Sequence, residues 1–138
     1  MDGVVRMADM ILGFIGGFVG FMLGGWTFAL TIFLVIQGLD IITGMMASAK
    51  HGKLESKIMK DGLIEKFGVW VLFVLAHFID MILFDNSSVA LTGLIFTFIG
   101  KEGMSIIENL SKMGVYIPKQ IGKYFSNIQE KGEGEEEK

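Results

Sequence analysis

The sequence predicts an all-α, polytopic membrane protein with three transmembrane helices, or four if a glycine-rich N-terminal segment also crosses. Three apolar segments approach the roughly 20 residues that a helix needs to span a bilayer: 26–46, 67–84 and 89–110. The chain is 51% hydrophobic with a mean hydropathy of +0.56, high for a soluble domain. Each segment also contains charged residues, which cost about 2.5–3.5 kcal/mol each at the centre of a membrane helix. We therefore expect one membrane domain, 1–138, whose charges face each other, a partner subunit or water.

The N-terminal segment 10–25 is apolar and dense in glycine. As a helix it would be about 24 Å long, which is short for a span. Its glycines recur four residues apart, a spacing that lets membrane helices pack closely and that favours self-association. The alternative is an interfacial helix that glycine merely weakens. The candidate helix-packing residues are Gly13, Gly16, Gly17, Gly20 and Gly24, together with Gly44 in the next segment. The short polar lead before residue 10 is not the basic start of a removable signal peptide.

The first two spans carry few polar residues, and these share one face of each helix. Gln37, Asp40 and Gly44 lie on one face of 26–46, and we expect Trp26 to anchor this helix at the membrane interface. His77 and Asp80 are three residues apart on 67–84. These groups either hold the helices together as buried hydrogen-bonded pairs or face water. A carboxylate beside His77 would also suit a pH-responsive pair, although a satisfied buried histidine explains it equally.

The distribution of lysine predicts the topology. The segment 50–66 holds five lysines and is expected to be a cytoplasmic loop, because Lys and Arg concentrate in cytoplasmic connections. The connection 85–88 has no basic residue and is expected outside, whereas the lysines after residue 110 place the C-terminus inside. Three spans put the N-terminus outside, and four put it inside.

The third span, 89–110, carries the most polar residues. They form a nearly continuous stripe along the helix, which exceeds what helix–helix contacts require and favours a face lined by water. Lys101 lies close to two acids with which it can pair. Over the three spans, the candidate pore-lining or intramembrane polar residues are Asp40, His77, Asp80, Thr97, Lys101, Glu102, Ser105, Glu108 and Asn109.

Two segments follow the third span. Residues 119–129 place Ile121, Tyr124, Phe125 and Ile128 on one face, which predicts a short amphipathic helix. This helix is expected on the inner membrane surface or against the 50–66 loop. The remaining residues, 130–138, are acidic and of low complexity, and we expect them to be disordered.

Enzymatic function is not expected. The chain has no cysteine, and the HExxH, GxSxG and P-loop patterns do not occur. His77, Asp80 and Ser105 are the types of a catalytic triad, but nothing in their spacing constrains their geometry. Asp40, Asp80 and Glu102 lie outside any ligand-dense loop, so we expect no metal and no cofactor. We expect no nucleic-acid partner.

Several motifs, taken in order, resemble the bacteriophage holin family, which includes toxin-secretion holins. They are DIITG at 40–44, the lysine segment with LESK and KDGL, AHFID at 76–80, GMSIIEN at 103–109 and MGVYIPK at 113–119. The resemblance covers about 24–125. Lys101 departs from it, because a small or amide residue is usual before the glutamate.

The resemblance implies a small protein of the bacterial cytoplasmic membrane that accumulates, oligomerises and forms lesions at a set time. These lesions would release a cell-wall hydrolase or a toxin without necessary direct contact. Subunits would first hide their polar faces and then turn them toward a water-filled interior. Moving one charge through the membrane potential is worth about 2.3 kcal/mol per 100 mV, so loss of the potential is a suitable trigger. A small ion or proton channel or transporter, and a non-conducting membrane adaptor, remain alternatives.

Overall fold

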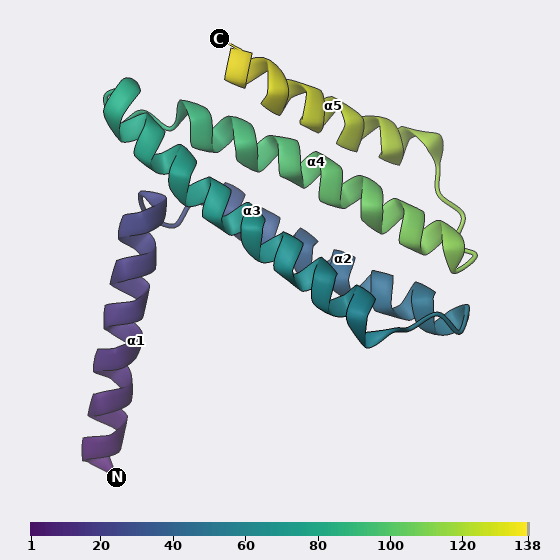
Figure 1. The fold of residues 1–138 in the computed structure, drawn as a ribbon. Helices are drawn as coiled ribbons and strands as arrows, with labels where there is room; N and C mark the ends of the chain where they lie inside the picture. Colours follow the sequence, from purple (N-terminus) through teal and green to yellow (C-terminus); the bar gives the residue numbers. More distant parts are fainter. Residues whose placement is uncertain (138) are drawn as a thin grey trace.

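The computed structural model describes residues 1–137 and folds them into five α-helices (Figure 1). They are α1 (Asp2–Leu23), α2 (Phe28–Lys50), α3 (Ser56–Leu83), α4 (Val89–Lys112) and α5 (Lys119–Glu137). The all-α prediction is confirmed. The first four helices are long and apolar enough to cross a membrane. The N-terminal helix is longer than the predicted segment 10–25 because it begins in the polar lead. It is one of four candidate spans, as in the four-span alternative.

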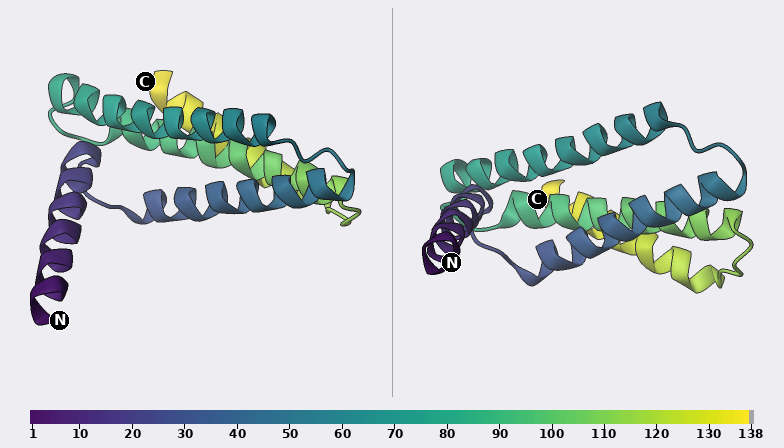
Figure 2. Two further views of the ribbon diagram at one scale, coloured as in Figure 1. Left: turned by 60° about the horizontal axis from the view of Figure 1, so that its bottom comes forward. Right: turned by 90° about the horizontal axis from the view of Figure 1, so that it is seen from below.

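Helices α2 to α5 form a bundle in which α4 contacts each of the other three (Figures 1 and 2). Helix α1 projects away from this bundle. The core lies between α2, α3 and α4. Its centre is a set of rings: Phe33 and Phe73 are fully buried with centroids 4.9 Å apart, and Trp70 meets both edge-on. Edge-to-face pairs of this kind add about 0.5–1.5 kcal/mol each beyond the burial of their area.

Helix α1 is attached to the rest of the molecule only through its end. Its apolar side chains are exposed, and Leu23 is its one buried residue among those described. Gly24 then adopts φ +74° and packs against the imidazole of His77, where an added Cβ would lie 2.5 Å from Cε1. The other N-terminal glycines predicted to pack helices (Gly13, Gly16, Gly17 and Gly20) have no atom of the described chain within 4 Å of an added Cβ. Their role in self-association stays a prediction.

The prediction that residues 50–66 form a loop is wrong for most of these residues. Helix α3 begins at Ser56, so only residues 51–55 connect α2 to α3. The charged residues that suggested a loop are good helix formers. Lys66 also continues the inner face of the helix, three and seven residues before Val69 and Phe73.

The C-terminal region also differs from the prediction. Segment 119–129 and the part of 130–138 that the structure describes form one helix, α5, which packs along α4 rather than on the segment 50–66 (Figure 1). The disorder predicted for 130–138 is therefore wrong through Glu137, and Lys138 lies outside the described residues. Composition suggested disorder, but Gly132 fits directly against α4, and Glu and Lys favour helix.

Candidate functional site: polar side chains between the helices

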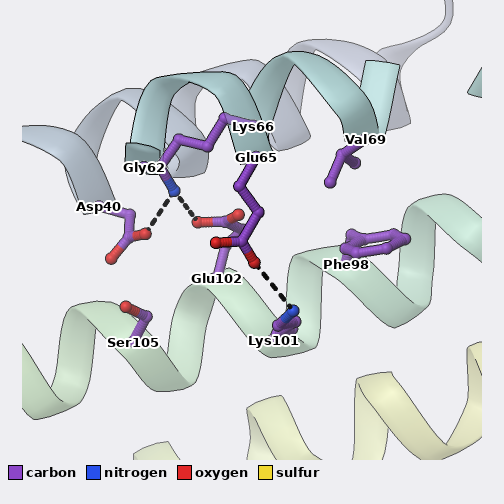
Figure 3. Close-up of a pocket in the computed structure, with 9 residues that line it drawn as sticks. All are labelled: Asp40, Gly62, Glu65, Lys66, Val69, Phe98, Lys101, Glu102 and Ser105. Carbon is purple, nitrogen blue, oxygen red and sulfur yellow. Dashed lines mark hydrogen bonds and ion pairs between the residues drawn. The ribbon is translucent and has the colours of Figure 1, made fainter. Parts of the chain in front are cut away.

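The most buried charges form a three-residue network that joins α2, α3 and α4. The Lys66 ammonium donates to Asp40 Oδ2 at 2.6 Å and to Glu102 Oε2 at 2.7 Å (Figure 3). The three side chains are only 18%, 10% and 9% exposed. One ammonium therefore holds two carboxylates from different helices. Because each carboxylate would be costly alone in an apolar setting, the lysine fixes the position of all three helices.

Asn109 extends this network toward the end of α4. Its amide nitrogen donates to Asp40 Oδ1 and to Thr43 Oγ1, both at 3.1 Å. Gly44 lies beside it, with an added Cβ 3.5 Å from the amide nitrogen. Of the predicted helix-packing glycines, Gly44 thus lies at the α2–α4 contact.

A second polar link joins α2 to α3 about one helical turn from the first. The Trp70 indole nitrogen donates to Gln37 Oε1 at 2.8 Å, and the ring stacks on Trp26 with centroids 6.1 Å apart. The Gln37 amide nitrogen is buried without a hydrogen-bond partner among the described residues. The tryptophan therefore satisfies one end of a buried amide whose other end is free.

Asp80 of α3 binds the backbone at the N-terminus of α4. Its two carboxylate oxygens accept hydrogen bonds from the backbone nitrogens of Ala90 (2.7 Å) and Leu91 (3.0 Å), and the residue is 1% exposed. A carboxylate at a helix N-terminus satisfies donors that the helix itself leaves free and complements the helix dipole. Asp80 therefore bonds to α4, while its predicted partner His77 packs against Gly24.

Two charged residues of α4, Lys101 and Glu108, face outward. Lys101 is 59% exposed, with its ammonium 3.8 Å from Glu65 of α3 and over the Phe98 ring. Glu108 is also exposed and pairs with Lys112 on its own helix at 3.1 Å. Neither Glu102 nor Glu108 is the partner of Lys101, although the sequence suggested one of them.

The predicted stripe on α4 is therefore divided among three surroundings. Glu102 and Asn109 bond to α2 and α3, whereas Lys101 and Glu108 lie at the surface. Thr97 donates to the carbonyl of Gly93 on its own helix and lies under α5. A single stripe in the sequence thus serves the core, the surface and a helix contact.

Ser105 lies at a cavity of about 250 Å³ that opens beside the network (Figure 3). Five of the residues that line it are charged, and Val69 and Phe98 form a short apolar wall. The full lining is Asp40, Gly62, Glu65, Lys66, Val69, Phe98, Lys101, Glu102 and Ser105. The cavity gives water a route to the edge of the buried network. Among the described residues, no group of three or more His, Asp or Glu side chains is placed to hold a metal ion.

Three residues that form hydrogen bonds between the helices were not predicted from the sequence: Thr43, Lys66 and Trp70. Lys66 was assigned to the loop because it precedes the apolar run by one residue. A signal for it exists: Lys66, Val69, Phe73 and Asp80 follow the three-and-four spacing of a buried helix face.

Comparison with known proteins places these helices in a family. The bacteriophage holin family model matches residues 17–130. An uncharacterized protein of Halalkalibacterium halodurans is 30% identical over 131 residues, which cover 91% of this chain and 94% of that protein. An uncharacterized protein of Listeria innocua is 31% identical over 128 residues, covering 93% and 90%. A probable holin of Bacillus phage phi105 is 35% identical over 92 residues, 67% of each chain.

No solved structure matches this chain. The family match runs from the second half of α1 into α5 and includes every residue of the polar network. The chain therefore belongs to the bacteriophage holin family.

Proposed function

We propose that this protein is a holin that oligomerises in the bacterial cytoplasmic membrane and forms lesions through which a cell-wall hydrolase or a toxin leaves the cell. The observation that carries the proposal is the exposure of charged groups on a helix of membrane-spanning length. Lys101 and Glu108 stand at the surface of α4, outside the bonded core. Lys101 lies near the middle of this helix and would cost a few kcal/mol if it faced lipid, so it requires water or a second subunit.

The membrane orientation follows from where the lysines gather. The α2–α3 and α4–α5 connections lie together, because Lys50 donates to the carbonyl of Met113 at 2.8 Å and His51 lies 3.1 Å from the carbonyl of Lys112. Basic residues are concentrated at this end, which the positive-inside rule places in the cytoplasm. The α4–α5 connection, from which the C-terminal helix starts, is then cytoplasmic, and with α1 as a fourth span the N-terminus is cytoplasmic as well.

The buried and the exposed polar residues have different roles in this proposal. The buried network keeps α2, α3 and α4 together as one unit in every state. The exposed groups of α4 contact other subunits in small closed oligomers and face water when the oligomers grow. The hydrolase or toxin passes through the lesion and need not touch any particular residue. The holin family is not an enzyme family, and the mechanism requires no catalytic step.

Orientation is tested by labelling. The chain has no cysteine, so Ser56→Cys, Ser126→Cys and Asn86→Cys each introduce a single thiol. A membrane-impermeant thiol reagent added to intact cells should label Asn86→Cys and spare the other two. Labelling of Ser56→Cys from outside would reverse the orientation.

Lesion formation is tested with vesicles that enclose both a small ion-sensitive dye and a folded fluorescent protein. Addition of the purified protein should release both cargoes. Release of the dye alone would indicate a narrow ion channel, and retention of both would indicate a non-conducting adaptor. Either result contradicts the holin proposal.

A further inference from the structure

Helix α5 contacts α4 through three glycines that bring the two backbones very close. An added Cβ on Gly100 would lie 2.7 Å from the carbonyl oxygen of Phe125, and one on Gly103 would overlap the Phe125 ring. An added Cβ on Gly132 of α5 would lie 2.5 Å from the carbonyl oxygen of Gly93. Two of these contacts are with backbone atoms, which cannot move aside as a flexible side chain can. The contact is therefore shaped for glycine on both helices.

The docked position places a polar helix beside the membrane-length part of α4. Since Gly132 touches Gly93 and Thr97 near the start of α4, the last turns of α5 reach the end of the bundle opposite the α4–α5 connection (Figure 1). Glu130 and Lys131 are exposed there, and Lys131 lies over the Phe96 ring. Charged groups at this depth oppose docking in a bilayer, while the close packing favours it. The cost of these charges and the gain from close packing therefore oppose each other, and a modest change in either can release α5 from α4.

The face of α4 beneath α5 suits a second helix. Gly93, Thr97 and Gly100 follow the three-and-four spacing of one helix face, and Met104 continues it toward the cytoplasmic end. The opposite face is already committed to α2 and α3 through Glu102 and Asn109. A two-fold contact between copies of this face would set small residue against small residue, the arrangement that allows close packing in lipid.

We propose that α5 is a removable strap over this face of α4, and that the α4 helix of a second copy takes its place when α5 withdraws. The inference rests on the proposed oligomeric holin and names the surface on which its subunits meet. Docked α5 and a neighbouring α4 compete for the same glycines. The strap therefore keeps the newly made subunit from assembling.

Competition gives two substitutions opposite effects. Gly132→Ala alters only the strap, so it should loosen α5 and leave the α4 face intact. Gly100→Leu alters the shared face, so it should block both the strap and the neighbouring α4. If α5 were an ordinary structural helix, both changes would reduce assembly. Gly134→Ala is the matched control, because an added Cβ there meets no described atom within 4 Å.

The experiment uses the full chain in membranes, with Met104→Cys as the only thiol. Oxidation should form a disulfide between the α4 helices of neighbouring copies, read as a dimer on a non-reducing gel. Gly132→Ala should raise the dimer fraction several-fold over the Met104→Cys parent. Truncation before Lys119 should do the same, Gly134→Ala should match the parent, and Gly100→Leu should fall below it.

Two results would overturn the strap. A dimer fraction that Gly132→Ala and truncation both leave at the parent value would mean that α5 does not cover α4 in the membrane. A fall with Gly132→Ala would mean that α5 supports assembly. Because the disulfide is read without any lesion, failure of cargo release with the expected dimer pattern contradicts the holin proposal and leaves the strap in place.

Discussion

Lys66 and Lys101 lie on opposite sides of one cavity, on α3 and α4, and their surroundings differ sharply (Figure 3). Lys66 is largely buried and bonds to two carboxylates at 2.6 and 2.7 Å. Lys101 is mostly exposed and approaches Glu65 at only 3.8 Å. A broken buried ion pair leaves a charge stranded, whereas an exposed pair contributes about 0–1 kcal/mol. The rotation of a residue around its helix, more than its type, therefore separates buried from exposed charge in this protein.

The largest expected effect is that of Lys66→Met. Removing the ammonium leaves two carboxylates facing each other without a counter-charge, and a broken buried pair typically costs about 3–5 kcal/mol. We expect the protein to fall well below its normal abundance in the membrane, measured by immunoblot of washed membranes. Lys60→Met, which removes an exposed lysine from the same helix, is the control and should accumulate normally. Normal abundance of Lys66→Met would show that the network does not hold the bundle together.

The Asp80 contact extends the comparison to the other end of the bundle. Asp80→Ala removes the acceptor for two backbone nitrogens at the start of α4, and losing such a cap costs about 0.5–2 kcal/mol. The helical signal of the purified protein in detergent should melt at a lower temperature. Asp61→Ala removes an exposed carboxylate from the same helix and should melt like the parent.

A smaller effect is expected from Trp70→Phe. The ring stays within the aromatic cluster, but the hydrogen bond to Gln37 is lost, which costs about 0.5–1.5 kcal/mol. The same melting experiment should place this variant between the parent and Asp80→Ala. A variant as stable as the parent would mean that the bond adds nothing beyond the packing of the ring.

The smallest effect on stability is expected at Glu108. Its pairing with Lys112 is exposed, so Glu108→Gln should change the free energy of unfolding by less than about 1 kcal/mol. Membrane abundance should be normal, while the onset of lysis in culture should shift because the exposed face of α4 has lost a charge. Unchanged timing would remove Glu108 from the groups that act during opening.

The sequence predicted the helical class, the apolar segments and the acidic residues within them, because length, hydropathy and charge are local properties. It missed the helical start of α3, since lysines look alike in a loop and on the outer face of a helix. Lys66 was therefore placed in the predicted loop and not on the buried face of α3. The division of the α4 stripe depends on which helices pack on which side, which spacing alone does not determine. The packing of α5 along α4 depends on the close fit of Gly132, and composition alone does not predict that fit.

The most direct test measures two quantities in the same cultures for Lys66→Met and Lys101→Met: abundance in the membrane and the time at which the membrane potential collapses. Lys66→Met should lose abundance, with activity falling in proportion. Lys101→Met should accumulate normally but collapse the potential at a different time. Normal abundance of Lys66→Met, or loss of abundance of Lys101→Met in step with its activity, would contradict the separation of the two lysines into a structural and a lesion-forming group.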